Sequence, residues 1–502
     1  MKKLKEYYIL IIIIMQPFLD VIAYFTMGTF FSIVPFIIRS MILLISTIYV
    51  LFKKRNKYYI IYLSILFIYT IFHLGNTYFT TNVNLIDNIE EFIRVFYLPI
   101  LTVNGFYIVG NNEKKIKQIH KGIIINIIII FIIIIAGVIT NTTVNTYAEG
   151  YGLRGWFYNS NSQSIILCFC VPFALYYLFK KNNVLCKIIS SAIAFFLLYS
   201  NGTTGCYLMI IPTFGLLMLD SLFYTKDLKK KLIELFILLI PVCSAVIFYK
   251  YSPDYKITQL SKASYSETEK NTQNYKDESE KGEGTDVKAS YGVTEKNTQN
   301  YKDESEKGEG TDGKCNIGEK NEEINNGVIP VETFETKLIT YYFNYNFIKD
   351  FGYDKILNNI GSKLDVGHLI NNRFRKKTVS SVIYNNSPIQ TKLLGIDFAQ
   401  VKSYDSDMES DYSAIFYYFG IIGIIVYLIP FIYIAFIILK KIYKNKKIIF
   451  QTEFILLISM FIMLNLFAEL SGSLLKRPNA SIYLCLLMVY INGKYERKNN
   501  EE

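Results

Sequence analysis

The chain has 502 residues, of which 51% are hydrophobic, 16% aromatic and only 19% charged. Apolar runs such as GIIINIIIIFIIIIAGVI, which starts at residue 122, exceed what the core helix of a soluble protein requires. Because about 20 apolar residues cross a bilayer as a helix, this composition excludes a soluble globular protein. The formal net charge of +11 does not by itself indicate nucleic-acid binding, and we expect no nucleic-acid partner.

The hydrophobic segments predict an all-α, polytopic transmembrane bundle of about twelve spans. The first span is too long for the apolar region of a cleavable signal peptide. The predicted ranges are 7–25, 30–52, 58–76, 91–110, 122–140, 162–180, 185–201, 204–224, 232–251, 412–439, 448–468 and 479–493.

Lysine-rich loops alternate with short loops that contain almost no lysine. Lysine and arginine mark cytoplasmic loops, so the alternation predicts that both termini are cytoplasmic. Anionic membrane lipid is the expected neighbour of these charges. The lysine-rich segments are MKKLK, KKRNK, NNEKKIKQIHK, KKNN, TKDLKKK, KKIYKNKK and KYERK.

The same orientation places one large loop outside the membrane, between spans nine and ten. Residues 263–288 and 289–314 form a tandem duplication that is too polar to bury a core, so we expect a low-complexity insertion. The following part regains apolar residues and predicts a small helical subdomain. The expected division is 1–251 for spans one to nine, 252–327 for the insertion, 328–411 for the ordered outer loop, 412–493 for spans ten to twelve, and 494–502 for the tail.

Four ionisable residues fall inside predicted spans. A charged side chain inside a membrane costs free energy and often has a function. Asp20, His73 and Arg94 are predicted near the outer ends of their helices, and Arg39 in the outer half of its helix. Snorkelling of Asp20 or Arg94, or pairing of Arg39 with Asp20, are structural alternatives. At the inner helix ends, Glu234 and Glu453 are expected to be solvated.

The outer loops contain the groups that a glycosyl transfer requires. Group transfer outside the membrane needs a donor already activated on a lipid, typically as a diphosphate. Guanidinium groups chelate phosphate oxygens through a planar fork, and a carboxylate or imidazole can take the proton of an acceptor hydroxyl. The outer arginines are Arg154, Arg373 and Arg477, the acid candidates are Asp405, Asp407, Glu409 and Asp411, the loop histidine is His368, and the amides are Asn159 and Asn161.

Four segments in this order resemble the O-antigen ligase and O-antigen polymerase family of bacterial membrane proteins. They are QPFLD at residues 16–20, LRGWFYNSNSQSIILCFCVPFALYYL at 153–178, NNRFRKKTVSSVIYNNSPIQTKLLGIDF at 371–398, and MESDYSAIFYYFGIIGIIVYLI at 408–429. The resemblance implies a membrane glycosyltransferase without cofactor or metal. It would move a glycan from an undecaprenyl-diphosphate-linked oligosaccharide to a glycan acceptor on the outer face of the bacterial cytoplasmic membrane.

By position, the resemblance assigns diphosphate binding and catalysis to Arg154 and Arg373. Ligases place a His-Asn pair before the span that follows the large loop. This chain has Glu409, Ser410 and Asp411 there, which favours a polysaccharide polymerase in which a carboxylate takes the proton. The full predicted site has catalytic Arg154, Arg373, Glu409 and Asp411, with substrate contacts from Asn159, Asn161, Arg94, Arg477 and Asp20.

Several alternatives stay open at this level. The reaction could be a ligase-type transfer to a different surface acceptor. The chain could instead be a flippase for the same lipid-linked oligosaccharide, although related halves are not evident. It could also be an assembly protein that works through its repeat arm. For the two amides, we expect Asn161 to cap its helix, and the role of Asn159 is open.

Overall fold

The computed structural model of the chain describes residues 7–81, 84–263, 266, 334–361, 371–405 and 407–496. Ten helices are long and apolar enough to cross a membrane, which confirms a helical, multi-pass membrane protein. The ten are α2 (Tyr8–Phe25), the continuous run of η1 (Phe30–Ile33), α3 (Val34–Tyr49) and η2 (Val50–Lys54), α4 (Lys57–Thr80), α5 (Leu85–Val109), α6 (Glu113–Ile139), α7 (Ser160–Phe179), α8 (Val184–Asn201), α9 (Thr204–Tyr224), α20 (Asp411–Lys444) and α21 (Thr452–Leu470).

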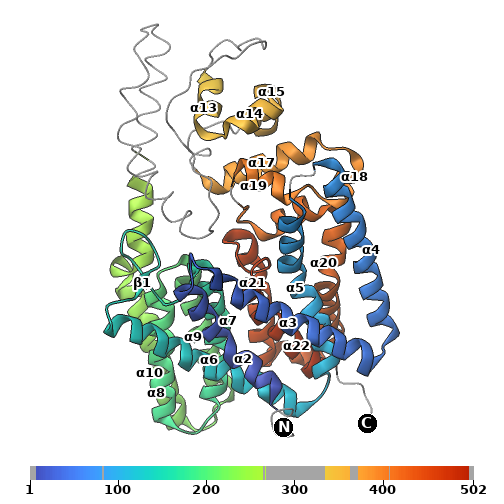
Figure 1. Cartoon of the computed structure of the whole chain (residues 1–502). Helices are drawn as coiled ribbons and strands as arrows, with labels where there is room; N and C mark the ends of the chain where they lie inside the picture. Colours follow the sequence, from blue (N-terminus) through green and yellow to red (C-terminus); the bar gives the residue numbers. More distant parts are fainter. Residues whose placement is uncertain are drawn as a thin grey trace.

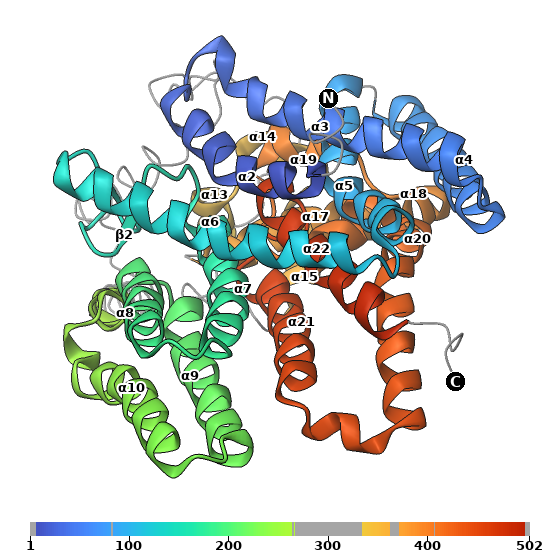
Figure 2. The same cartoon turned by 90° about the horizontal axis from the view of Figure 1, so that it is seen from below.

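The other two predicted spans correspond to α10 (Leu228–Ile247) and α22 (Pro478–Tyr495), which are also long helices. Three consecutive lysines follow Leu228, the first residue of α10. α22 carries polar residues but is buried along nearly its whole length, between α5, α6, α7, α20 and α21. A helix enclosed by protein need not be as apolar as one that faces lipid. Figure 2 shows α22 in the middle of the bundle.

Glycines allow α22 to approach its neighbours closely. A Cβ on Gly105 of α5 would lie 2.3 Å from a methyl group of Val489, and one on Gly493 would lie 2.6 Å from the Gly110 carbonyl oxygen. Small residues are the usual means of close helix packing in membranes, where van der Waals contact drives association.

Asparagine side chains cap the start of five spans. Each accepts a hydrogen bond from a backbone N–H of the first turn, which satisfies a donor that has no partner within the helix. This accounts for the sharp starts of α4, α5, α6, α7 and α8 in an otherwise isoleucine-rich sequence. The caps are Asn56, Asn84, Asn112, Asn159 and Asn183.

The connections between spans form two groups at opposite ends of the bundle (Figure 1). At one end, Lys115 lies over the Tyr8 ring and Lys494 pairs with Glu453. At the other end, the Ser162 hydroxyl donates to the Ser473 carbonyl, 3.2 Å away. These contacts mark the two ends of the bundle, and the alternation of the loops across a membrane stays a prediction. The assignment of the lysine-rich end to the cytoplasm stays a prediction.

Short helices cover the end of the bundle opposite the lysine-rich loops. A two-stranded hairpin, β1 (Val144–Asn145) with β2 (Leu153–Gly155), is the only sheet among the described residues, and η3 and η5 are short turns between spans. The tandem repeat, apart from residues 263 and 266, and His368 lie outside the described residues. The short elements are α13 (Phe334–Tyr342), α14 (Tyr345–Phe351), α15 (Tyr353–Ile360), α17 (Asn372–Asn386), α18 (Ile389–Leu394), α19 (Phe398–Tyr404), η3 (Tyr249–Tyr251) and η5 (Lys446–Phe450).

The expectation that Glu234 and Glu453 are solvated was wrong. Glu234 is buried, forms a salt bridge with the buried Lys187, and accepts hydrogen bonds from Ser221 and Thr225. Glu453 accepts from the Tyr177 hydroxyl as well as pairing with a lysine. Sequence position at a helix end did not reveal these partners, because each comes from a different helix.

Replacing Glu234 by Gln should strongly destabilise the protein, because the buried Lys187 would lose its counter-charge. Removing one partner of a buried ion pair costs roughly 3–5 kcal/mol. The control is Asp220→Asn, which removes the partner of Lys180, a lysine whose side chain is 47% exposed. Such exposed pairs contribute about 0–1 kcal/mol. Thermal unfolding in detergent measures both variants, and equal melting temperatures would contradict the prediction.

Candidate functional site

The candidate site lies where the start of α20 meets the connection between α21 and α22. Asp411, the first residue of α20, is completely buried. Its carboxylate accepts hydrogen bonds from the backbone N–H groups of Ser473, Leu474 and Leu475 at 3.1, 2.8 and 2.7 Å. These bonds fix the shape of the connection. Because the carboxylate of Asp411 is buried and hydrogen-bonded, neither of its oxygens is exposed to contact a substrate.

Gly472 makes the close approach of these two segments possible. Its φ is +67°, and a Cβ there would lie 1.6 Å from the Glu409 carbonyl oxygen. The next residue, Ser473, accepts a hydrogen bond from Ser162 in the first turn of α7. The segments before α20, after α21 and at the start of α7 are therefore one connected surface.

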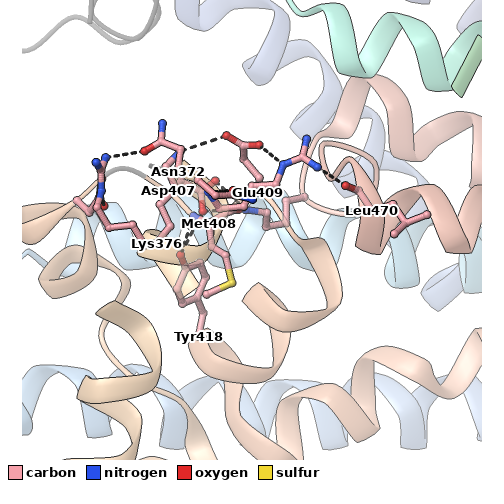
Figure 3. Close-up of polar contacts among 12 residues, drawn as sticks. Asn372, Lys376, Asp407, Met408, Glu409, Tyr418 and Leu470 are labelled. Carbon is pink, nitrogen blue, oxygen red and sulfur yellow. Dashed lines mark hydrogen bonds and ion pairs between the residues drawn. The ribbon is translucent and has the colours of Figure 1, made fainter. Parts of the chain in front are cut away.

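Arg373, Lys376 and Glu409 form an ion-paired group on this surface. Arg373 Nε donates to Glu409 Oε2 at 2.7 Å, and Lys376 Nζ lies 3.3 Å from the other carboxylate oxygen. A further guanidinium N–H donates to the carbonyl of Leu470, at the end of α21. Figure 3 shows Glu409 between Lys376 and Leu470. The Arg373 side chain is 42% exposed and that of Glu409 32%, so both are accessible from outside.

A second ion pair lies beside the first. Lys476, which is only 4% exposed, contacts both carboxylate oxygens of Asp407 at 2.7 and 2.8 Å and also donates to the Met408 carbonyl. The Tyr418 hydroxyl accepts a hydrogen bond from the Met408 N–H at 3.1 Å. The segment that carries Glu409 is thus held on both sides.

Electrostatics keeps both accessible carboxyl groups ionised. Burial acts to raise the pKa of Glu409, but the charges of Lys376 and Arg373 outweigh it and hold this pKa below its usual range. Burial likewise acts on Asp407, and Lys476 with Arg477 lowers its pKa. Nearby opposite charge favours the charged form of an acid.

Two further arginines of the predicted site are Arg477, next to this group in the chain, and Arg94 on α5. Arg477 is the N-cap residue of α22, directly after Lys476, and its charge acts on Asp407. Within the described part of the chain, its guanidinium makes no hydrogen bond or salt bridge that would occupy it. Arg94 pairs with Glu90 at 2.5 Å and lies over the Phe36 ring.

Arg154 lies in strand β2, and its backbone carbonyl accepts a hydrogen bond from the Gln163 amide at 2.9 Å. The same hairpin carries Tyr147. Burial and the nearby Asp254 raise the pKa of Tyr147 to about 12, and the charge of Arg373 opposes this rise. The helix that follows the hairpin, α7, contacts the connection before α22 through Ser162 and Ser473.

The prediction that Asn161 caps its helix was wrong. Asn159 is the N-cap of α7 and accepts from the Ser162 N–H at 2.9 Å, whereas Asn161 is the second residue of the helix. The position of Asp20 also differs from the one expected for a residue that contacts substrate. It is 5% exposed and forms a salt bridge with Arg39 at 2.7 Å inside the membrane region.

Two residues of the site were missed in the sequence, Lys376 and Lys476. Lys476 could have been noticed, because the short connections on its side of the bundle contain almost no other lysine. Lys376 lies in the large loop, which contains many lysines, so the sequence offered no such signal for it. Among the described residues, no group of three or more His, Cys, Asp or Glu side chains could hold a metal ion.

Acid should destabilise this site in a defined direction. Folding lowers the pKa values of Glu409 and Asp407, so the unfolded chain binds more protons than the folded chain at low pH. Stability is then fully present above the unfolded carboxyl pKa of about 4 and is lost as the pH falls through the lowered folded values. Melting temperatures between pH 7 and pH 3 should fall less steeply in Glu409→Gln than in the wild type. Parallel curves would contradict the assignment.

Comparison with known proteins gives one match. A family model described as O-antigen ligase like membrane protein matches residues 2–329 and 362–495. No significant match was found among curated proteins or among solved structures. The matched ranges include every residue of the ion-paired surface, from the hairpin of Arg154 to Arg477. The chain therefore belongs to the O-antigen ligase-like family of membrane proteins.

Proposed function

We propose that the protein is a polysaccharide polymerase of the bacterial cytoplasmic membrane, acting on O-antigen- or capsule-type glycans. It would transfer a glycan from an undecaprenyl-diphosphate-linked donor to the glycan of a second lipid-linked molecule on the outer face. The observation that carries the proposal is the accessible Arg373–Glu409 pair beside Arg477. Family membership supports a lipid-linked glycan as the substrate class.

The arginines provide the diphosphate site in this proposal. The Arg477 side chain has no hydrogen-bond or salt-bridge partner to displace among the described residues, and Arg373 is 42% exposed, so both can turn toward phosphate oxygens. A guanidinium binds such oxygens through two parallel N–H donors and stays charged at any physiological pH. Arg154 and Arg94 would bind the outer parts of the donor.

Glu409 takes the acceptor proton. Its carboxylate is ionised because Lys376 and Arg373 lower its pKa, so it is ready to accept a hydrogen bond from the attacking hydroxyl. When Arg373 binds the diphosphate, Glu409 loses part of its neutralising charge. A carboxylate with less positive charge beside it is a stronger base, so donor binding activates it.

The reaction is a single displacement. The acceptor oxygen forms a bond to the anomeric carbon, and the bond from that carbon to the diphosphate oxygen breaks. The acceptor proton passes to Glu409, the diphosphate leaves with the bonding electron pair, and the anomeric configuration inverts. Negative charge grows on the leaving diphosphate, so Arg373 and Arg477 stabilise the transition state more than the bound donor.

The remaining predicted residues take supporting roles. Asp411 organises the connection before α22 through its three N–H contacts. Asp407 neutralises Lys476 and holds the backbone next to Glu409. Ligase-type transfer to another surface acceptor uses the same donor site. A ladder of products of increasing length distinguishes a polymerase, because a ligase adds each glycan once to a different acceptor.

Removing the arginines should abolish polymer formation. Arg373→Ala and Arg154→Ala should each leave the protein level unchanged and reduce polymer to background. Arg373→Lys keeps the charge but loses the planar fork, so it should retain only part of the activity. Gel analysis of surface polysaccharide measures the outcome. Near-normal polymer length in both alanine variants would refute the proposal.

Glu409→Gln should lower turnover by about 10²-fold or more, the typical contribution of a general base. The amide can still accept a hydrogen bond from Arg373, so donor binding should change little. The matched variant is Glu90→Gln, which removes the partner of Arg94. Turnover and the KM for the donor are measured for both purified variants. Equal, small losses in both variants would show that Glu409 does not take the proton.

A further inference from the structure

The outer segment and α20 meet at two glycines. Gly420 interrupts α20 with a φ of +64°, and Gly395 follows α18 with a φ of +107°. A Cβ on Gly395 would lie 2.1 Å from the Tyr418 carbonyl oxygen, and one on Gly420 would lie 2.5 Å from the Leu393 carbonyl oxygen. The two backbones are in direct contact, which side chains at these positions would prevent.

The interruption of α20 frees backbone groups in a helix that crosses the membrane, where unsatisfied polar groups cost several kcal/mol each. Two carbonyls just before the interruption have partners from outside α20. The Ile396 N–H of the outer segment donates to the Tyr417 carbonyl at 3.0 Å. The Tyr69 hydroxyl of α4 donates to the Phe419 carbonyl at 2.7 Å.

Three polar residues on one face of α4, at positions i, i+4 and i+7, hold this junction, and we name them the α4 clamp: Tyr69, His73 and Asn76. His73 Nδ1 lies 2.8 Å from the Leu394 carbonyl oxygen, and it must be the donor because a carbonyl only accepts. Asn76 donates to the Gly395 carbonyl at 3.2 Å. Tyr69 and His73 are 3% and 2% exposed, so these contacts are shielded from water.

Both segments that carry the site begin or end at this junction. α17, with Arg373 in its first turn, leads directly into α18 (Figure 1). The chain that leaves Gly395 passes through α19 to Glu409 and returns along α20 to Gly420. The Tyr384 hydroxyl of α17 also donates to the Lys392 carbonyl of α18 at 3.3 Å, which ties the two helices together.

We propose that the α4 clamp positions Arg373 and Glu409 for glycosyl transfer without touching the substrate. The inference rests on the proposed function of that site. It adds that α4, which contributes no residue to the site, controls the geometry of the site. Arg477 precedes α22 and lies outside the segments that the α4 clamp holds. Donor binding through Arg477 is therefore retained when the hydrogen bonds of the clamp are lost. Turnover therefore depends on the clamp more than donor binding does.

The test compares two buried tyrosines of α4. Tyr69→Phe removes the hydroxyl that holds the Phe419 carbonyl, whereas Tyr62→Phe removes a hydroxyl that has no hydrogen-bond partner among the described residues. Tyr69→Phe should lower kcat about tenfold with the donor KM nearly unchanged. It should also speed amide hydrogen exchange in peptides covering 389–405. Tyr62→Phe should change neither quantity.

A second pair of variants distinguishes loss of the hydrogen bond from misfolding of the protein. His73→Asn keeps an N–H donor near the Leu394 carbonyl and should retain most activity, whereas His73→Leu keeps the bulk and should lose it. Equal behaviour of Tyr69→Phe and Tyr62→Phe, or of the two His73 variants, would overturn the positioning role. Absence of turnover in the wild type would refute the proposed function instead, and the exchange measurement would still test the clamp.

Discussion

The end of the bundle that carries the candidate site is organised around the buried carboxylate of Asp411. Its hydrogen bonds to three consecutive N–H groups tie the first residue of α20 to the connection before α22. The same connection carries Lys476 and Arg477, and the segment just before Asp411 carries Asp407 and Glu409. A fully buried, fully hydrogen-bonded carboxylate is a rigid element, because each lost contact would leave a polar group unsatisfied. The charged residues of the site project from this element.

The charges form a graded set. Lys476 is buried and neutralises Asp407, whereas Arg373 and Glu409 are both partly exposed and exchangeable. A bound diphosphate can compete with Glu409 for Arg373 but cannot reach the buried Lys476 as easily. Lys476 therefore holds the backbone in place while Arg373 changes partners, which is the behaviour that a transfer site requires.

The sequence was sufficient to predict long membrane helices, because long apolar runs are local patterns. It also indicated which connections carry arginines and carboxylates, but the site that they form stays a prediction. The pairing of Arg373 with Glu409 was not predictable, since it depends on how α17 lies against the segment before α20. The cap of α7 differed from the prediction by two residues, Asn159 in place of Asn161, because both amides precede the same apolar run. The burial of Glu234 and the α4 clamp were likewise not predictable, because the partners of these residues come from other helices.

The most direct measurement uses purified protein in lipid nanodiscs with a lipid-linked oligosaccharide of one repeat unit, in the presence of a metal chelator. The account predicts a ladder of longer lipid-linked glycans and the release of one undecaprenyl diphosphate for each new glycosidic bond. Recovery of the donor intact, with no ladder and no released undecaprenyl diphosphate, would contradict it.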